Sequence, residues 1–301
     1  MKATRDAFGE QLVESAMTND SIVAVNADLG KATKLSMFKD SFPDRFIEVG
    51  IAENNMIGIV SGLSEHGYKV FLASFASFLT GKYDTLRCSI AYSNAPVVIV
   101  GSHGGLAIGK DGVTQMGLED ISLMRSLPNM VVLNPATPIE CREIVKYLCD
   151  TKLDRPHYLR IGRQPVEEVF DEHYRFNVLE AVYIRAGRRL NAIFTTGCIL
   201  PEVLKVANDL DFDVVHFPVV KPIAKFNILY FIGLYHNIFT VEDHSIIGGL
   251  GSAVAEIMAE NPSRTKLTRI GIDDVFPESG APEDLYEKYG LSYNAMMERM
   301  K

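Results

Sequence analysis

Short apolar segments rich in Val, Ile and Phe alternate along the chain with longer stretches of helical periodicity. Strands that are apolar throughout and separated by helices are typical of a parallel sheet covered by helices on both faces. The pattern therefore predicts an α/β fold of the doubly wound type. In the first half of the chain we expect strands at residues 22–26, 46–49, 70–75, 97–101, 130–134 and 157–161.

A charged stretch without periodicity divides the chain. Residues 164–189 contain the segment EEVFDEHYRF, whose composition predicts a surface linker between two domains. We predict a larger domain at residues 1–165, a linker at 166–189 and a smaller α/β domain at 190–301. In the smaller domain we expect strands at 192–196, 214–217, 238–242 and 267–272, and a last helix near 293–300.

Composition and charge narrow the class of protein. The 301 residues are 47% hydrophobic, which is enough for two cores. A net charge of -8 without a long basic run argues against nucleic acid as a partner. The four cysteines form no CxxC pair and no metal-ligand spacing with histidine, which predicts free thiols. No signal peptide or membrane span is recognisable, and the longest apolar run, 228–234, is typical of a buried core element. We therefore expect a cytoplasmic protein that contacts no membrane.

Residues 46–67, FIEVGIAENNMIGIVSGLSEHG, lead from a short strand through a glycine turn into a long apolar helix. Glu53 stands at the start of this helix, where the helix dipole by itself favours an acidic residue. Its neighbours in the sequence are mostly apolar, and such surroundings favour the protonated carboxyl group. A carboxyl group in this state can share a proton with a bound base, so Glu53 is a candidate catalytic residue.

This segment resembles the pyrimidine-binding domain of the transketolase family of thiamine diphosphate enzymes. The resemblance implies that Glu53 hydrogen-bonds the ring nitrogen of the thiamine aminopyrimidine. It continues without a gap through SFASFLTGKYDTLR, which places Phe75 and Phe78 beside the pyrimidine and Gly81 where many members carry a third aromatic residue. Asp28, in the segment ADL, matches a pocket aspartate of the family and could equally cap a helix or a turn.

A glycine-rich loop follows the strand near residue 100 and precedes a helix. Such a loop lets the backbone approach a ligand closely. In the family, His103 matches a histidine that binds the substrate phosphate and Asp111 matches an aspartate that contacts a sugar hydroxyl. Gln115 stands where a second histidine is common. The spacing between His103 and Asp111 favours transketolase over the related deoxyxylulose-phosphate synthases.

Two arginines complete the resemblance at the substrate site. A planar guanidinium suits a terminal phosphate because it can donate two parallel hydrogen bonds. Arg5 and Arg163 match the phosphate-binding arginines of the family, although either one alone is also typical of a solvated surface. Ala32 replaces a serine that assists them in many members. Farther along, the glycines at 248–251 satisfy no G-x-G-x-x-G pattern, which argues against a dinucleotide site.

The chain contains no GDG segment, which in the family begins the module for the diphosphate and its metal ion. The resemblance therefore implies the C-terminal subunit of a split transketolase, with no metal site of its own. A separate N-terminal subunit would bring Mg²⁺ or a similar ion and the diphosphate-binding domain. We expect a homodimer of this chain within a heterotetramer. The expected reaction transfers a two-carbon ketol unit from a ketose phosphate to an aldose, as in the pentose phosphate branch of carbohydrate metabolism.

Three alternatives remain open at this stage. A deoxyxylulose-phosphate synthase or the beta subunit of a 2-oxo-acid dehydrogenase would share the glutamate and the two-domain plan. The residues that match phosphate and sugar contacts favour transketolase over both. The third alternative is a regulatory or binding subunit that retains the fold and has no catalytic role.

Overall fold

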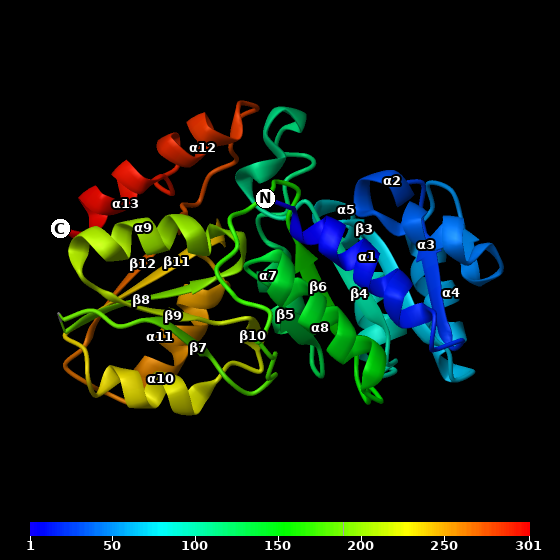
Figure 1. Cartoon of the computed structure of the whole chain (residues 1–301), viewed down its shortest axis with the longest axis horizontal. Helices are drawn as coiled ribbons and strands as arrows, with labels where there is room; N and C mark the ends of the chain where they lie inside the picture. Colours follow the sequence, from blue (N-terminus) through cyan, green and yellow to red (C-terminus); the bar gives the residue numbers. More distant parts are fainter. Residues whose placement is uncertain (189) are drawn as a thin grey trace.

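The computed structural model describes residues 1–188 and 190–301 and arranges them around two β-sheets, each flanked by helices (Figure 1). Within these ranges the first sheet has seven strands and the second has five. Both sheets are mainly parallel, so the predicted α/β class with two doubly wound units is confirmed. No helix in the described ranges is long and apolar enough to cross a membrane.

The first sheet has the strand order β10-β5-β6-β4-β3-β1-β2. All neighbouring pairs are parallel except β10, which joins β5 antiparallel. The strands are β1 (Ile22–Asn26), β2 (Phe46–Glu48), β3 (Lys69–Phe75), β4 (Val98–Ser102), β5 (Val131–Leu133), β6 (His157–Ile161) and β10 (Val219–Lys221).

Helices cover both faces of this sheet because its strands are apolar on both sides. In β1, for example, Ile22 and Ala24 belong to one buried cluster while Val23 and Val25 belong to the other. The first face carries α1 (Thr4–Ala16), α3 (Leu35–Ser41) and α8 (Pro138–Asp150). The second carries α4 (Glu53–Glu65), α6 (Tyr83–Leu86), η2 (Arg87–Ala91) and α7 (Asp120–Ser126). The short elements α2 (Gly30–Thr33), η1 (Pro43–Arg45), α5 (Ala76–Thr80) and η3 (Leu106–Asp111) lie in the connections.

The second sheet has the order β12-β11-β8-β9-β7, and its edge strand β7 is antiparallel to β9. Its strands are β7 (Val182–Arg185), β8 (Asn191–Thr196), β9 (Asp213–His216), β11 (Asn237–Ser245) and β12 (Lys266–Ile272). One face packs against α9 (Leu200–Leu210), α12 (Pro282–Lys288) and α13 (Tyr293–Met300). The other face packs against α10 (Lys225–Ile232) and α11 (Leu250–Glu260), and η4 (Gly197–Ile199) follows β8.

The two sheet units share buried polar and apolar contacts. The carboxylate of Glu140 in α8 lies 2.8 Å from His216 Nε2 of β9 and accepts a hydrogen bond of 2.7 Å from the Tyr174 hydroxyl. Glu140 and His216 are both fully buried. The ring of Phe170 packs on Tyr174 with a centroid distance of 4.1 Å. These buried hydrogen bonds therefore join the two sheet units. Tyr174, which takes part in them, lies in the segment between β6 and β7.

The strands predicted from the sequence agree with the structure to within about three residues at each end. Two strands were missed, β7 and β10, because each is too short to show a period and becomes a strand only by pairing with a distant segment. β7 lies inside the predicted linker 166–189, so part of that segment forms regular secondary structure. The linker's last residue, 189, lies outside the described residues, and the domain boundaries stay predictions.

The apolar run at 228–234 is only partly a core element. It forms most of α10, whose Ile228, Phe231 and Ile232 are buried. Tyr230 and Leu234 remain 65% and 46% exposed. The prediction of a buried core element holds for one side of the helix only, because the helix packs one face on the second sheet and leaves the other exposed.

We predict that Glu140→Ala lowers the free energy of unfolding by about 3–5 kcal/mol, because the change leaves the Tyr174 hydroxyl and His216 buried without their partner. Urea unfolding followed by circular dichroism measures the change. Glu143→Ala, a half-buried position on the same helix, is the matched control and is expected to lose about 1 kcal/mol or less. Equal losses in the two variants would contradict the assignment.

Candidate active site

The predicted site residues gather along one edge of the first sheet because they follow the ends of its parallel strands. Asp28 comes after β1, Glu53 after β2, His103 after β4 and Arg163 after β6, while Phe75 is the last residue of β3. The carboxyl ends of parallel strands lie at the same edge, which is where doubly wound sheets bind ligands. Strand order therefore brings together residues from across the first half of the chain.

Arg5 reaches this edge from the first turn of α1. That turn is held to the end of β6 because the Gly162 amide donates a hydrogen bond of 2.7 Å to Thr4 Oγ1. Arg5 Nη1 lies 3.2 Å from the Ala32 carbonyl oxygen and 3.4 Å from His103 Nε2. Arg5 Nε is buried and has no hydrogen-bond partner in the described structure. The guanidinium is thus fixed at one end and retains a free donor.

His103 is 3% exposed. Its neighbours include the aromatic ring of Phe75 and the guanidinium group of Arg5. Its ring packs on Phe75 with a centroid distance of 4.1 Å, and its Nδ1 lies 2.7 Å from Ser102 Oγ. Burial first, and then the charges of Arg5 and Arg163, lower the pKa of His103 to about 3. Because Arg5 can only donate, we assign the ring proton to Nδ1 and leave Nε2 as the acceptor. His103 is therefore a neutral imidazole at physiological pH.

Arg163 and Asp111 form the second predicted pair. Arg163 Nη1 lies 2.9 Å from Asp111 Oδ2 and 3.0 Å from the Ile108 carbonyl oxygen. Both side chains are partly open to solvent, with exposed fractions of 37% and 50%. Gln115 lies farther along the same loop and is half-buried. Arg163 therefore ties the loop to the end of β6, and its side chain remains partly exposed to solvent.

Glu53 is the first residue of α4, and its side chain is half-buried. Of its apolar neighbours in the sequence, Met56 and Ile57 are fully buried, whereas Ile51 is 82% exposed. Within the described residues, no hydrogen bond joins Glu53 or Asp28 to the arginine and histidine cluster. The surface around Glu53 is therefore open on this chain alone.

The aromatic residues predicted for the pyrimidine pocket are adjacent. The rings of Phe75 and Phe78 have a centroid distance of 5.3 Å, with Phe75 buried and Phe78 half-buried. Gly81 is the exposed residue that ends α5. Gly81 adds no side chain there, and Phe78 is the more exposed of the two rings.

Two residues that the sequence analysis missed organise this edge. Glu48 accepts hydrogen bonds of 2.9 Å from the amides of Asp28 and Gly50, and another from Asn26 Nδ2. Burial alone would raise the pKa of Glu48, but these hydrogen bonds outweigh it and lower the pKa. Ser102 orients His103 as described above. Glu48 had one signal in the sequence, a carboxylate directly before a strand-to-helix turn, whereas Ser102 had none.

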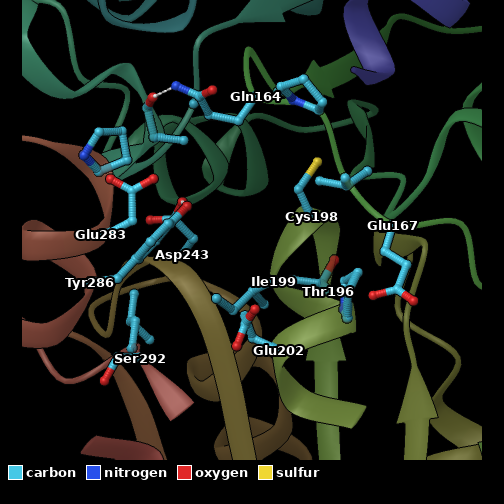
Figure 2. Close-up of a pocket in the computed structure, with 18 of the residues that line it drawn as sticks. Gln164, Glu167, Thr196, Cys198, Ile199, Glu202, Asp243, Glu283, Tyr286 and Ser292 are labelled. Atoms are coloured by element: carbon cyan, nitrogen blue, oxygen red, sulfur yellow. Dashed lines mark hydrogen bonds between the residues drawn. The ribbon is translucent and has the colours of Figure 1, made fainter. Parts of the chain in front are cut away.

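A cavity of about 400 Å³ lies between the two sheet units (Figure 2). Figure 2 shows Gln164, Cys198, Asp243 and Tyr286 around it. None of the predicted site residues lines this cavity. We place the candidate chemistry at the strand edge, because Arg5, His103, Arg163 and Asp111 are in hydrogen-bond contact there. Within the described part of the chain, no group of three or more His, Cys, Asp or Glu side chains is arranged to hold a metal ion.

Comparison with known families agrees with this geometry. The model of the transketolase pyrimidine-binding domain matches residues 1–168, and the model of the transketolase C-terminal domain matches residues 165–296. The chain belongs to the transketolase family. The two family models together cover nearly the whole chain, so the resemblance inferred from the motifs is confirmed.

Relatives of transketolase type match over most of their own length. A Methanocaldococcus jannaschii protein, provisionally named as a transketolase C-terminal section, is 36% identical over 99% of this chain and 95% of its own. A 6-deoxy-6-sulfo-D-fructose transketolase subunit of Clostridium sp. (strain MSTE9) is 35% identical over 96% of this chain and 90% of its own. The 1-deoxy-D-xylulose-5-phosphate synthase of Histophilus somni is 30% identical, and there the chain spans only 47% of the relative.

Solved structures of transketolases give the same picture. A split-gene transketolase, described as an inactive β4 tetramer, superposes with a TM-score of 0.90 at 38% identity, covering 99% of this chain and 97% of that one. The transketolase of Campylobacter jejuni superposes with a TM-score of 0.81 at 22% identity and is covered over 46% of its length. At that identity the second likeness concerns the fold alone.

The buried neutral state of His103 predicts a pH dependence. In the unfolded chain a histidine titrates near pH 6.5, whereas the folded pKa is about 3, so stability is lost as the pH falls from about 6.5 toward about 3. His103→Asn removes this loss. We expect the variant to retain about 2 kcal/mol of the stability that the wild type loses between about pH 7.5 and pH 5.

Urea unfolding at the two pH values measures the difference. Asn tolerates the left-handed backbone of this position, where φ is 63°. His173→Asn, at a histidine that is 82% exposed, is the control and is expected to follow the wild type. If His103→Asn lost as much stability on acidification as the wild type, the buried neutral state would be excluded.

Proposed function

We propose that this chain is the C-terminal half of a thiamine-diphosphate-dependent transketolase that works with a separate N-terminal subunit. The pair transfers a two-carbon ketol unit from a ketose phosphate to an aldose or aldose phosphate. The observation that carries the proposal is the cluster of Arg5, His103, Arg163 and Asp111, which holds two guanidinium groups and a neutral imidazole at one sheet edge. Residue matches to the family support the same assignment.

The cluster suits a sugar phosphate. The protein has a net charge of -8, so two guanidinium groups on one edge mark a local site for an anion. Arg5 Nε is buried and unpartnered, and a phosphate oxygen would satisfy it. Asp111 accepts from Arg163 through one oxygen, which leaves the other for a sugar hydroxyl. Phosphate and hydroxyl recognition are thus available a short distance apart.

The residues of the sheet edge also fit the pyrimidine end of thiamine diphosphate. Glu53 offers a carboxyl group at a helix start, and Phe78 offers a ring face. When bound, the cofactor supplies the electron sink that allows a two-carbon unit to leave one sugar and join another. In our proposal Glu53 holds a proton at its carboxyl oxygen and shares it with the pyrimidine ring nitrogen, and Phe78 orients the ring by stacking. Phe75 supports Phe78, with Asp28 and Gly81 at the rim.

A second subunit is part of the proposal. The chain has no GDG segment, and the surface around Glu53 is open on this chain alone. The N-terminal subunit would cover this surface and bring the diphosphate grip together with Mg²⁺ or a similar ion. The similar split-gene transketolase described as an inactive β4 tetramer supports the requirement for that partner. We propose a homodimer of this chain within a heterotetramer.

The alternatives differ in the substrate that they consume. The 30% identity to a deoxyxylulose-phosphate synthase over 98% of this chain supports that alternative. Such a synthase and a 2-oxo-acid dehydrogenase would both consume a 2-oxo acid such as pyruvate. A silent regulatory subunit would consume nothing. Asp111, the predicted contact of a sugar hydroxyl, is hydrogen-bonded to Arg163, a predicted phosphate ligand. This pairing favours a ketose phosphate as the substrate.

The function is tested by co-expressing the chain with a candidate N-terminal subunit and assaying ketose phosphates and pyruvate, with each chain omitted in turn. We expect ketol transfer from at least one ketose phosphate only when both chains and thiamine diphosphate are present. Pyruvate consumption in place of ketol transfer would move the assignment to a synthase or dehydrogenase. Turnover by this chain alone would exclude the split enzyme.

Glu53→Gln is expected to lower kcat of the reconstituted pair by about 10²–10⁴-fold, because the amide keeps the size of the side chain and loses the acid proton. Assembly, measured by size-exclusion chromatography, is expected to be unchanged. Glu65→Gln, at the exposed end of the same helix, is the matched control and is expected to retain full activity. Near-normal turnover by Glu53→Gln would remove Glu53 from the mechanism.

A further inference from the structure

The glycines of the loop at residues 103–117 approach other parts of the protein, which corrects the expectation that they make room for a ligand. At Gly105, φ is +84° and an added Cβ would lie 2.1 Å from Asp243 Oδ2 of β11. At Gly112, φ is +81° and the nearest atom would be Ser279 Oγ at 2.5 Å. Only glycine allows the loop backbone to lie this close to the second sheet unit.

Asp243 holds the beginning of the loop. Its Oδ1 accepts a hydrogen bond of 2.9 Å from the Leu106 amide, and its Oδ2 accepts one of 2.8 Å from the Tyr286 hydroxyl. Figure 2 shows Asp243 and Tyr286 side by side. Asp243 is 8% exposed, so these donors replace water. Tyr286 thus holds the Asp243 carboxylate in place, and that carboxylate in turn holds the Leu106 amide.

The end of the loop is held by Arg160 of β6 and by the backbone of β11. Arg160 Nη2 donates hydrogen bonds of 2.8 Å to the Gly117 carbonyl oxygen and 3.0 Å to the Asp243 carbonyl oxygen. The Ser245 amide of β11 donates one of 2.8 Å to the Leu118 carbonyl oxygen. The Gly105 amide donates one of 2.8 Å to the Gly117 carbonyl oxygen and closes the loop at its neck. Both ends of the loop therefore rest on β11.

Apolar side chains of the loop complete this contact. Leu106, Ile108 and Met116 of the loop, and Leu118 directly after it, are buried in a cluster that also contains residues of β12 and α12. Leu285 of α12 belongs to this cluster and is 1% exposed. In Figure 1 the loop lies beside α12. The loop is thus packed against the second sheet unit by both polar and apolar groups.

We propose that Asp243 and Tyr286 of the second sheet unit are positioning residues that set the conformation of the loop at residues 103–117 for substrate binding. The effect on substrate rests on the function proposed above. The loop carries Asp111 and Gln115 and begins at His103, so a shift at Leu106 would move the sugar and phosphate contacts together. The second sheet unit thereby takes part in substrate affinity without touching the substrate.

Tyr286→Phe tests the proposal, because it removes one hydroxyl from the Asp243 carboxylate and leaves the ring in place. Tyr293→Phe is the matched control, since its hydroxyl donates to Asp209 of α9 and not to Asp243 or to the loop. In the reconstituted enzyme we expect KM for the ketose phosphate to rise about 3- to 10-fold, with kcat within about twofold, because the loss of one hydrogen bond of typical net strength has this size. The affinity for thiamine diphosphate is expected to stay unchanged.

Amide hydrogen exchange of the loop provides a readout on this chain without its partner. We expect exchange at residues 105–117 to become about 10-fold faster in Tyr286→Phe and to stay at the wild-type rate in Tyr293→Phe. Gly105→Ala, which places a methyl group against Asp243, is expected to shift both readouts in the same direction and by more.

Unchanged exchange in Tyr286→Phe would overturn the positioning role, and faster exchange with an unchanged KM would overturn its effect on substrate. A wild-type pair that showed no ketol transfer would instead refute the proposed function. The exchange experiment would then still decide whether Tyr286 and Asp243 hold the loop.

Discussion

The buried ion pair of Arg160 and Asp120 joins the parts of this molecule on which the candidate site depends. Arg160 Nε lies 2.9 Å from Asp120 Oδ2, and both side chains are almost completely buried. Burial alone would lower the pKa of Arg160, but the carboxylates of Asp120 and Asp243 outweigh it and raise the pKa. Tyr158 adds a hydrogen bond of 2.7 Å to Asp120. A charge pair this deep is tolerated because Arg160 Nε and Nη2 both donate to buried acceptors.

From this pair the contacts extend in two directions. Toward the first sheet, Arg160 lies in β6, directly before the segment that carries Arg163. Toward the second sheet, it donates to the backbone of Asp243 and to Gly117. Gly104 can only be glycine here, because a Cβ would lie 2.3 Å from Arg160 Nε. One buried guanidinium therefore links the strand edge, the loop and the second sheet unit.

Much of the fold was predictable from the sequence, but less of the site. The strand that begins at Ile22 is apolar on both faces, which is typical of a strand in a sheet covered by helices on both sides. β10 could not be predicted, because a three-residue strand gains its stability from pairing with β5 across the chain. The motifs also indicated His103 and Arg5, yet their contact of 3.4 Å depends on α1 packing beside β6. The supporting residue Tyr286 carries no motif, since its role arises from Asp243, which is far away in the sequence.

The sequence by itself determined the α/β class, the family and the set of candidate residues, because hydrophobic period and motif spacing are local properties of the chain. Only the tertiary structure decided how these residues are held. In the folded chain His103 is a neutral imidazole, because burial and the charges of Arg5 and Arg163 together lower the pKa of its ring. The tertiary structure turned the glycines of the loop toward Asp243 and Ser279, because close packing of distant segments leaves no room for a side chain. It also left Glu53 close to an exposed surface, since Ile51 is 82% exposed among the residues that the structure describes.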